Sequence, residues 1–201
     1  MPRVSAEHLE ATRQRILDAS RRCFVRNGFH VTSMQDILAE ARLSVGAVYR
    51  YFPSKDDIVI AIVDAALDDV TESVRDIFDG PTPPALDVVI GRILRSGPPM
   101  DGSPTSARLM LQVWGEAARS PELRERYAAS FQAWRAFITS IVEVYQRSGQ
   151  LTSTVPAAHL TPALIAIVQG FMVQVALTGD IDVSALESGV RGLLMGREGN
   201  S

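Results

Sequence analysis

The feature that most constrains this 201-residue chain is a run of short, sharply bounded helical signals between residues 32 and 57. Ser33, with Asp36 three residues later, has the pattern of a capping box, which satisfies the first free N–H groups of a helix. Apolar side chains then recur at the spacing of one helix face: Met34, Ile37, Leu38 and Ala41. The run therefore begins with a short helix that carries one apolar stripe.

A tight turn and a second short helix are predicted next. Arg42 and Leu43 are expected to form the turn, and Ser44 is placed to cap the following helix. Pro53 ends that helix, and Ser54 with Asp57 forms another capping box that begins a further one. The segment is thus suited to abrupt changes of direction.

The second short helix is expected to have two different faces. The inward side chains are predicted to be Val45, Val48 and Phe52, and the outward residues Gly46, Ala47, Tyr49 and Arg50. Glycine inside a helix costs about 1 kcal/mol relative to alanine, which makes sense if the backbone lies close to another surface. A helix that presents small and hydrogen-bonding groups outward is suited to enter a DNA groove.

The same run resembles the DNA-binding domain of TetR-type (TetR/AcrR-type) one-component transcriptional regulators. The matching motifs, in order, are Thr32-Ser33, Ile37 with Ala39, Leu43-Ser44, Val48-Tyr49-Arg50-Tyr51-Phe52 and Lys55. One position departs from the pattern, because Arg42 stands where the family usually has a glycine. The resemblance covers roughly residues 10 to 60, and the remainder is similar only in helix count and length.

The resemblance implies that the matching positions contact operator DNA: Thr32, Ser33, Ser44, Val45, Gly46, Ala47, Tyr49, Arg50, Tyr51 and Lys55. Hydroxyls and helix-terminal N–H groups suit phosphates, as does the ammonium of Lys55. Arg50 is suited either to guanine in the major groove or to a phosphate, and Val45 and Ala47 are small enough to approach thymine methyls. The alternatives are that the two tyrosines are partly buried and that Lys55 is a solvated helix cap.

The rest of the chain predicts an all-α fold of nine helices, since no alternating strand pattern occurs. Beyond the helix-turn-helix, the expected helices cover about residues 54–79, 85–96, 105–119, 121–147, 156–178 and 183–195, with Pro162 either beginning or kinking its helix. The predicted domains are a DNA-binding domain at 1–53 and a helical effector-binding and dimerisation domain at 54–196, followed by a disordered tail at 197–201.

Charge is divided unevenly along the chain. Residues 1–60 hold nine basic and seven acidic side chains, whereas residues 61–201 hold eleven and sixteen. The sign change is modest but favours a head that faces a polyanion. From Ser148 to Gly179 no Asp, Glu, Lys or Arg occurs, yet glutamines, a glycine and a proline interrupt the run, so a buried helix is expected rather than a membrane span.

A homodimer is expected, because one short helix buries too little surface for specific binding. Two recognition helices about 34–36 Å apart would read a palindromic site. By resemblance, the last two helices form the dimer contact, with Val168, Phe171, Val175 and Leu193 as candidates; the alternative is that these four belong to the core of their own chain.

The resemblance also implies a small-molecule effector that enters among the middle helices and releases the protein from its operator. Candidate ligand residues are Met100, Arg108, Met110, Gln112, Trp114, Glu116, Phe131, Trp134 and Phe137, although such side chains at helical spacing are more often plain core. Their apolar and aromatic character suggests an apolar or aromatic compound. No cofactor is expected, and the location implied is cytoplasmic.

Other classes of protein are less consistent with the sequence. His8, His30 and His159 stand apart with no metal-ligand spacing, and no phosphate-binding glycine loop occurs, so neither a metal site nor an enzyme is expected. The single cysteine, Cys23, lies on an apolar stripe with Ile16 and Phe24 and is expected to be buried. A helical adaptor would explain the apolar eighth helix but not Tyr49, Arg50 and Lys55 together. A regulator that needs no ligand, or an activator, also remains open.

Overall fold

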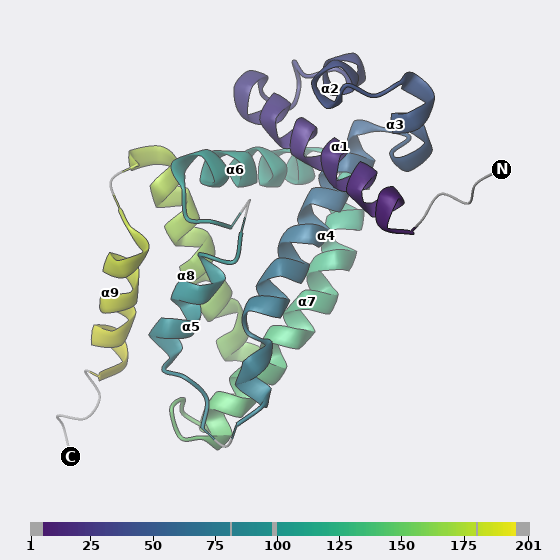
Figure 1. The fold of residues 1–201 in the computed structure, drawn as a ribbon. Coiled ribbons are helices and arrows are strands. Elements are labelled where there is room, and N and C mark those ends of the chain that lie inside the picture. The colour runs from purple at the N-terminus through teal and green to yellow at the C-terminus, as the bar shows by residue number, and fades with distance from the viewer. Residues whose placement is uncertain (1–5, 81, 98–99, 180, 196–201) are drawn as a thin grey trace. The chain divides into compact units, whose positions relative to one another are not determined.

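The computed structural model describes residues 6–80, 82–97, 100–179 and 181–195. Over these residues the chain forms nine α-helices, one 3₁₀ helix and no strand, which confirms the expected all-helical fold (Figure 1). The helices are α1 (Ala6–Asn27), α2 (Met34–Ala41), α3 (Val45–Tyr51), α4 (Lys55–Ser73), η1 (Arg75–Phe78), α5 (Leu86–Ile93), α6 (Pro104–Arg119), α7 (Pro121–Arg147), α8 (Ala157–Thr178) and α9 (Val183–Met195).

Two of the expected helices end earlier than predicted, because the helix expected over residues 85–96 ends at Ile93 and α4 is also shorter. The helix expected over residues 54–79 ends at Ser73, and the short η1 helix follows it. Pro162 lies inside α8 rather than at its start, and Pro156 occupies the N-cap position instead. The expected tail at 197–201 lies outside the described residues.

The chain divides into two compact units. The first is Met1–Asp64 with Gln112–Tyr127, and the second is Ala65–Leu111 with Ala128–Ser201. Helices α4, α6 and α7 therefore each contribute residues to both units.

In the first unit, α1 packs against α2, and α3 follows after a turn (Figure 1). Their buried side chains come from all three helices: Ile16, Leu17 and Phe24; Ile37, Leu38 and Ala41; Val48 and, at the end of α3, Phe52. Cys23 is fully buried in the same core, as predicted, and burial raises the pKa of its thiol. The three helices hold together because each contributes apolar side chains to one core.

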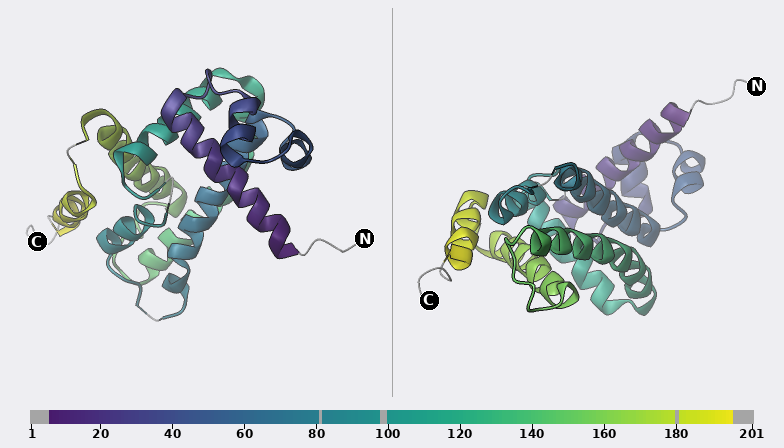
Figure 2. Two further views of the ribbon diagram at one scale, coloured as in Figure 1. Left: turned by 45° about the horizontal axis from the view of Figure 1, so that its top comes forward. Right: turned by 90° about the horizontal axis from the view of Figure 1, so that it is seen from below.

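In the second unit, α9 lies along α5 (Figure 2). Arg191 donates to the buried carboxylate of Asp87 at 2.8 Å, and Arg95 contacts Glu187 through both guanidinium ends at 2.7 and 3.2 Å. Gly91 stands between these pairs, and the carboxylate of Glu187 leaves no room for a side chain there. A larger residue at this position would require the side chains of Glu187 and Arg95 to move.

Helix α8 buries one of its faces, which carries Thr161, Ile165, Val168, Phe171, Met172, Val175 and Ala176. Among the described residues, α8 is long and apolar enough to cross a membrane. Core helices of globular proteins meet the same criterion, so this is weak evidence for a span. The buried face indicates that α8 serves as a core helix of the second unit.

Candidate nucleic-acid interface and effector cavity

Helix α2 begins with the capping box that the sequence predicts. The backbone N–H of Asp36 donates to Ser33 Oγ at 3.1 Å, and the backbone N–H of Ser33 donates to Asp36 Oδ2 at 2.8 Å. Hydrogen bonds from the Ser33 backbone and hydroxyl lower the pKa of Asp36. Ser54 and Asp57 make the same pair of bonds before α4, at 2.9 and 3.2 Å, and so fix where that helix starts.

The turn between α2 and α3 contains Arg42 in the left-handed region, with φ 53° and ψ 46°. This conformation costs a non-glycine residue roughly 1–2 kcal/mol. The carbonyl of Arg42 accepts a hydrogen bond from Arg15 of α1 at 3.0 Å, and its N–H reaches the last carbonyls of α2. The turn thus has the conformation that a glycine would normally supply, held by contacts on both sides.

Helix α3 presents most of its residues to solvent. Val48 and Phe52 are buried as predicted, and Arg50 is exposed, while Tyr49 retains 43% of its accessible surface. The prediction that Val45 faces inward is wrong, because this first-turn residue is 61% exposed. Ala47 and Tyr51 are half-buried, and the Tyr51 ring lies 6.5 Å from that of Phe52.

Gly46 also lies on the exposed surface of α3. A methyl group placed on it would meet no other atom of the described chain, so internal packing does not require a glycine here. Ser44 caps the helix by accepting the N–H of Ala47 at 3.3 Å.

Two residues predicted to contact DNA make their hydrogen bonds inside the protein instead. Thr32 is fully buried, and its hydroxyl lies 2.7 Å from the carbonyl of Gly28 and 3.2 Å from that of Cys23. The ammonium of Lys55 donates to the carbonyls of Phe29 and Thr32 at 2.8 and 2.7 Å and lies over the Phe29 ring. Thr32 therefore has no hydroxyl to offer, and Lys55 is neither a solvated cap nor a free cation.

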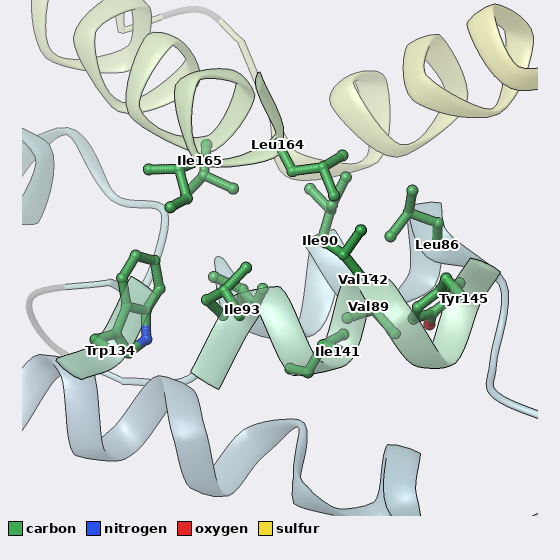
Figure 3. Close-up of a pocket in the computed structure, with 12 residues that line it drawn as sticks. Leu86, Val89, Ile90, Ile93, Trp134, Ile141, Val142, Tyr145, Leu164 and Ile165 are labelled. Carbon is green, nitrogen blue, oxygen red and sulfur yellow. The ribbon is translucent and has the colours of Figure 1, made fainter. Parts of the chain in front are cut away.

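A cavity of about 40 Å³ lies in the second unit among α5, α7 and α8 (Figure 3). Branched aliphatic side chains form most of its wall: Leu86, Val89, Ile90, Ile93, Ile138, Ile141, Val142, Leu164, Ile165 and Val168. Trp134 and Tyr145 complete the lining, which contains no charged residue. The Tyr145 hydroxyl donates to the carbonyl of Pro84 at 2.8 Å, and burial raises its pKa.

Of the nine predicted ligand residues, only Trp134 lines this cavity. Its indole N–H is buried without an acceptor among the described residues, and Phe131 packs against its ring at 5.3 Å. Phe137 pairs instead with Phe78, Met110 is buried, Met100 is half-buried, and exposed Arg108 donates to the carbonyl of Ala176.

The three remaining candidates, Gln112, Trp114 and Glu116, belong to the first unit. Gln112 Oε1 accepts the backbone N–H of Phe29, and Glu116 pairs with His30. The polar atoms of Gln112 and Glu116 are thus engaged by the loop between α1 and α2, whereas the buried indole N–H of Trp114 has no acceptor among the described residues.

The predicted dimer residues also separate into two groups. Val168, Phe171 and Val175 are buried within their own unit, which favours the core alternative for these three. Leu193 is 78% exposed, as an interface residue would be in an isolated chain.

The cavity residues of α5 were not assigned from sequence. Leu86, Val89, Ile90 and Ile93 follow the i, i+3, i+4, i+7 pattern, so their shared face was visible. The pattern does not show which helices cover this face.

Two family models match the chain. Residues 16–62 match the model of bacterial regulatory proteins of the tetR family, and residues 93–195 match that of the BetI-type transcriptional repressor C-terminal domain. The second match alone covers about half of the chain. The two together follow the order of the DNA-binding head and the helical region behind it.

Individual relatives agree with these matches. The regulator UidR of Escherichia coli K12 is 22% identical over 187 residues, or 93% of each chain. YfiR of Bacillus subtilis is 37% identical over 68 residues, so that the match spans about a third of its length. A transcriptional regulator from Saccharomonospora viridis, solved with choline, superposes with a TM-score of 0.68 at 24% identity, over 94% of this chain and 97% of that one.

Members of this family are DNA-binding transcriptional regulators rather than enzymes. The order of the helices, the capped helix-turn-helix and the two family matches lead to one conclusion. The chain belongs to the TetR family of bacterial transcriptional regulators.

Proposed function

We propose that the protein is a homodimeric repressor that binds a palindromic operator through α3 and is released by a small uncharged effector. The observation that carries the proposal is the surface of α3, which exposes Val45, Gly46, Tyr49 and Arg50 while Val48 anchors the helix from behind. We assign the reading of the DNA sequence to this face of α3. The proposed location is the cytoplasm, since that is where bacterial DNA is bound.

The proposed contacts fall into two classes. Arg50 and Val45 would read base edges in the major groove, because an exposed guanidinium suits guanine and an exposed isopropyl group suits a thymine methyl. Tyr49, Tyr51 and the N-terminal ends of α2 and α3, with Ser33 and Ser44, would meet phosphates. Gly46 and Ala47 would allow the backbone of α3 to approach the DNA closely.

Dimerisation is proposed through the outward faces of α8 and α9. Leu177 and Leu193 are 74% and 78% exposed, and Leu194 is also exposed. On the same two helices, Gly170, Gly189 and Gly192 leave open space where a neighbouring chain could come close. Large exposed apolar side chains are typical of a protein–protein interface. The two-fold symmetry of a dimer would match a palindromic operator.

The cavity of the second unit supports an apolar effector. Its lining is aliphatic apart from Trp134 and Tyr145 and contains no carboxylate to balance a cation. Quaternary ammonium ligands are bound by cages of several aromatic rings, so choline, present in the Saccharomonospora structure, is not expected here. A carbonyl or ether oxygen on the effector would supply the acceptor that the Trp134 N–H lacks.

A ligand-independent regulator is the second candidate, and one observation favours it. The cavity of about 40 Å³ is far smaller than the roughly 300–1,000 Å³ of ordinary ligand pockets. An effector would therefore have to open the space between α5, α7 and α8. If no apolar compound stabilises the protein, the cavity is a packing defect and regulation occurs at the level of expression.

DNA binding can be tested by selecting duplexes from a random-sequence pool with the purified protein. The selected sequence should be palindromic, and its affinity should fall steeply as NaCl is raised. Tyr49→Phe and Arg50→Ala should weaken binding while leaving thermal unfolding unchanged. No enrichment over the pool would refute operator recognition, and an enriched sequence without two-fold symmetry would refute the dimer.

A further inference from the structure

The loop between α1 and α2, residues 28–33, is held by side chains from two other helices of the same unit. It connects the end of α1 at Asn27 with the start of α2 at Met34. Its last two residues are Thr32, which is buried, and Ser33, which is the N-cap of α2. The position of this loop therefore determines where the N-terminal end of α2 lies.

One contact comes from α4. The Lys55 ammonium donates to the carbonyls of Phe29 and Thr32 at 2.8 and 2.7 Å, and it lies 4.5 Å from the centre of the Phe29 ring. Two of its three N–H donors are thus used inside the protein. A charged donor shared by two carbonyls is among the stronger hydrogen-bonding arrangements.

The other contacts come from the last turns of α6. Gln112 Oε1 accepts the backbone N–H of Phe29 at 3.1 Å. Glu116 Oε1 lies 2.5 Å from His30 Nε2, and Arg119 Nη2 lies 3.2 Å from both Glu116 Oε2 and His30 Nδ1. Glu116 is buried, so its carboxylate is held between these two partners.

These contacts lead to a role that differs from the one suggested by sequence. We infer that Lys55, Gln112 and Glu116 are positioning residues, which fix loop 28–33 and thereby place α2 for DNA binding, and that they contact neither phosphate nor effector. The inference rests on the proposed operator binding by α2 and α3. Since Pro104–Leu111 of α6 belong to the second unit, the same helix also links this loop along the chain to that unit.

The test uses fluorescence anisotropy with the duplex selected by the wild-type protein, titrated at several NaCl concentrations. The variants are Lys55→Met and Gln112→Met, which keep length but remove the polar group, and Gln112→Glu, whose carboxylate can still accept the Phe29 N–H. Gly115→Ala is the matched control, because this exposed residue lies on the same turn of α6 and its added methyl group meets nothing.

We expect Gln112→Met and Lys55→Met to weaken binding about tenfold, while the slope of log affinity against log salt stays at the wild-type value. Gln112→Glu should restore most of the affinity, and Gly115→Ala should match the wild type. Hydrogen exchange of the first amides of α2 should accelerate in Gln112→Met. Thermal unfolding of each variant identifies any that is not folded at the assay temperature. If a methionine variant is not folded, the affinity of Gln112→Glu and the exchange rates of the α2 amides decide whether the inference holds.

Two results would overturn the inference. If Lys55→Met lowers the slope of log affinity against log salt by the amount expected for about one phosphate contact, Lys55 contacts DNA directly. Wild-type affinity and wild-type exchange in folded Gln112→Met would show that the loop contacts do not position α2. The proposed function is tested separately by Arg50→Ala: if Arg50→Ala loses binding and Gln112→Met does not, only this inference fails.

Discussion

The helix-turn-helix of the first unit and the cavity of the second are built by different means. In the former, capping boxes at Ser33 and Ser54 and a short turn at Arg42 set the structure within a few residues of chain. In the latter, α5, α7 and α8 each contribute one apolar face to a shared interior (Figure 3). The helix starts of the head are thus set by local hydrogen bonds, whereas the cavity depends on packing between segments far apart in the sequence.

If the cavity wall is ordinary core, removing part of it should have the largest effect. Ile138→Ala should lower the free energy of unfolding by about 2–5 kcal/mol, because it removes buried methyl groups and enlarges an existing void. Urea denaturation measures the change, and Val88→Ala on the exposed face of α5 serves as the control. Equal losses in the two variants would show that the wall is loosely packed.

The head should behave in the opposite way, with function lost and stability kept. Arg50→Ala should reduce affinity for the selected duplex by about 1–3 kcal/mol if Arg50 reads a base, with no change in unfolding, since Arg50 is exposed. Arg124→Ala removes the same charge from an exposed site on α7 and is the matched control. An equal loss in both would attribute the effect to net charge alone.

The local hydrogen bonds of the head should also respond to pH. Ser54→Ala should cost roughly 0.5–2 kcal/mol at neutral pH, because it removes the capping group of α4. Hydrogen bonds that the Ser54 hydroxyl and the Arg126 guanidinium donate to the carboxylate of Asp57 lower its pKa below the ordinary value of 3.8. The folded state is therefore stabilised above that value, and this contribution disappears as the pH falls through the lowered pKa.

Denaturation of the wild type and of Ser54→Ala across this range measures the effect. The difference between them should shrink below about pH 3.8. A difference that stays constant to lower pH would show that the ionised carboxylate of Asp57 contributes nothing to the stabilisation by Ser54.

The smallest expected change separates stability from binding at a single residue. Gly46→Ala should stabilise the fold by about 0.5–1 kcal/mol, since the methyl group meets no atom of the described chain. It should nevertheless weaken DNA binding if α3 lies close to the bases. Gly115→Ala should give a similar gain in thermal stability with unchanged binding, and a binding loss in both would contradict the role given to Gly46.

The local part of this architecture was accessible from sequence. Both capping boxes, the buried Val48 and Phe52 and the ends of α7 and α9 follow from patterns within a few turns of helix. The left-handed Arg42 was flagged by its departure from glycine, but its conformation depends on a hydrogen bond from Arg15, which is distant in sequence.

The errors arose where distant segments meet. Thr32 was expected to offer its hydroxyl to DNA, yet this hydroxyl is buried near the carbonyl of Gly28 at 2.7 Å and that of Cys23 on α1 at 3.2 Å. Gln112 and Glu116 were assigned to an effector, yet they meet a loop more than eighty residues away. Periodicity identifies which face of a helix is buried but not which element covers it.

Whether α3 of a dimer reads DNA is tested by protection of promoter DNA upstream of the protein's own and neighbouring genes. Two protected half-sites related by two-fold symmetry are expected, with centres about 34–36 Å apart, and protection should weaken steeply with salt. A monomeric protein that leaves this DNA unprotected even at low ionic strength would contradict this role of α3.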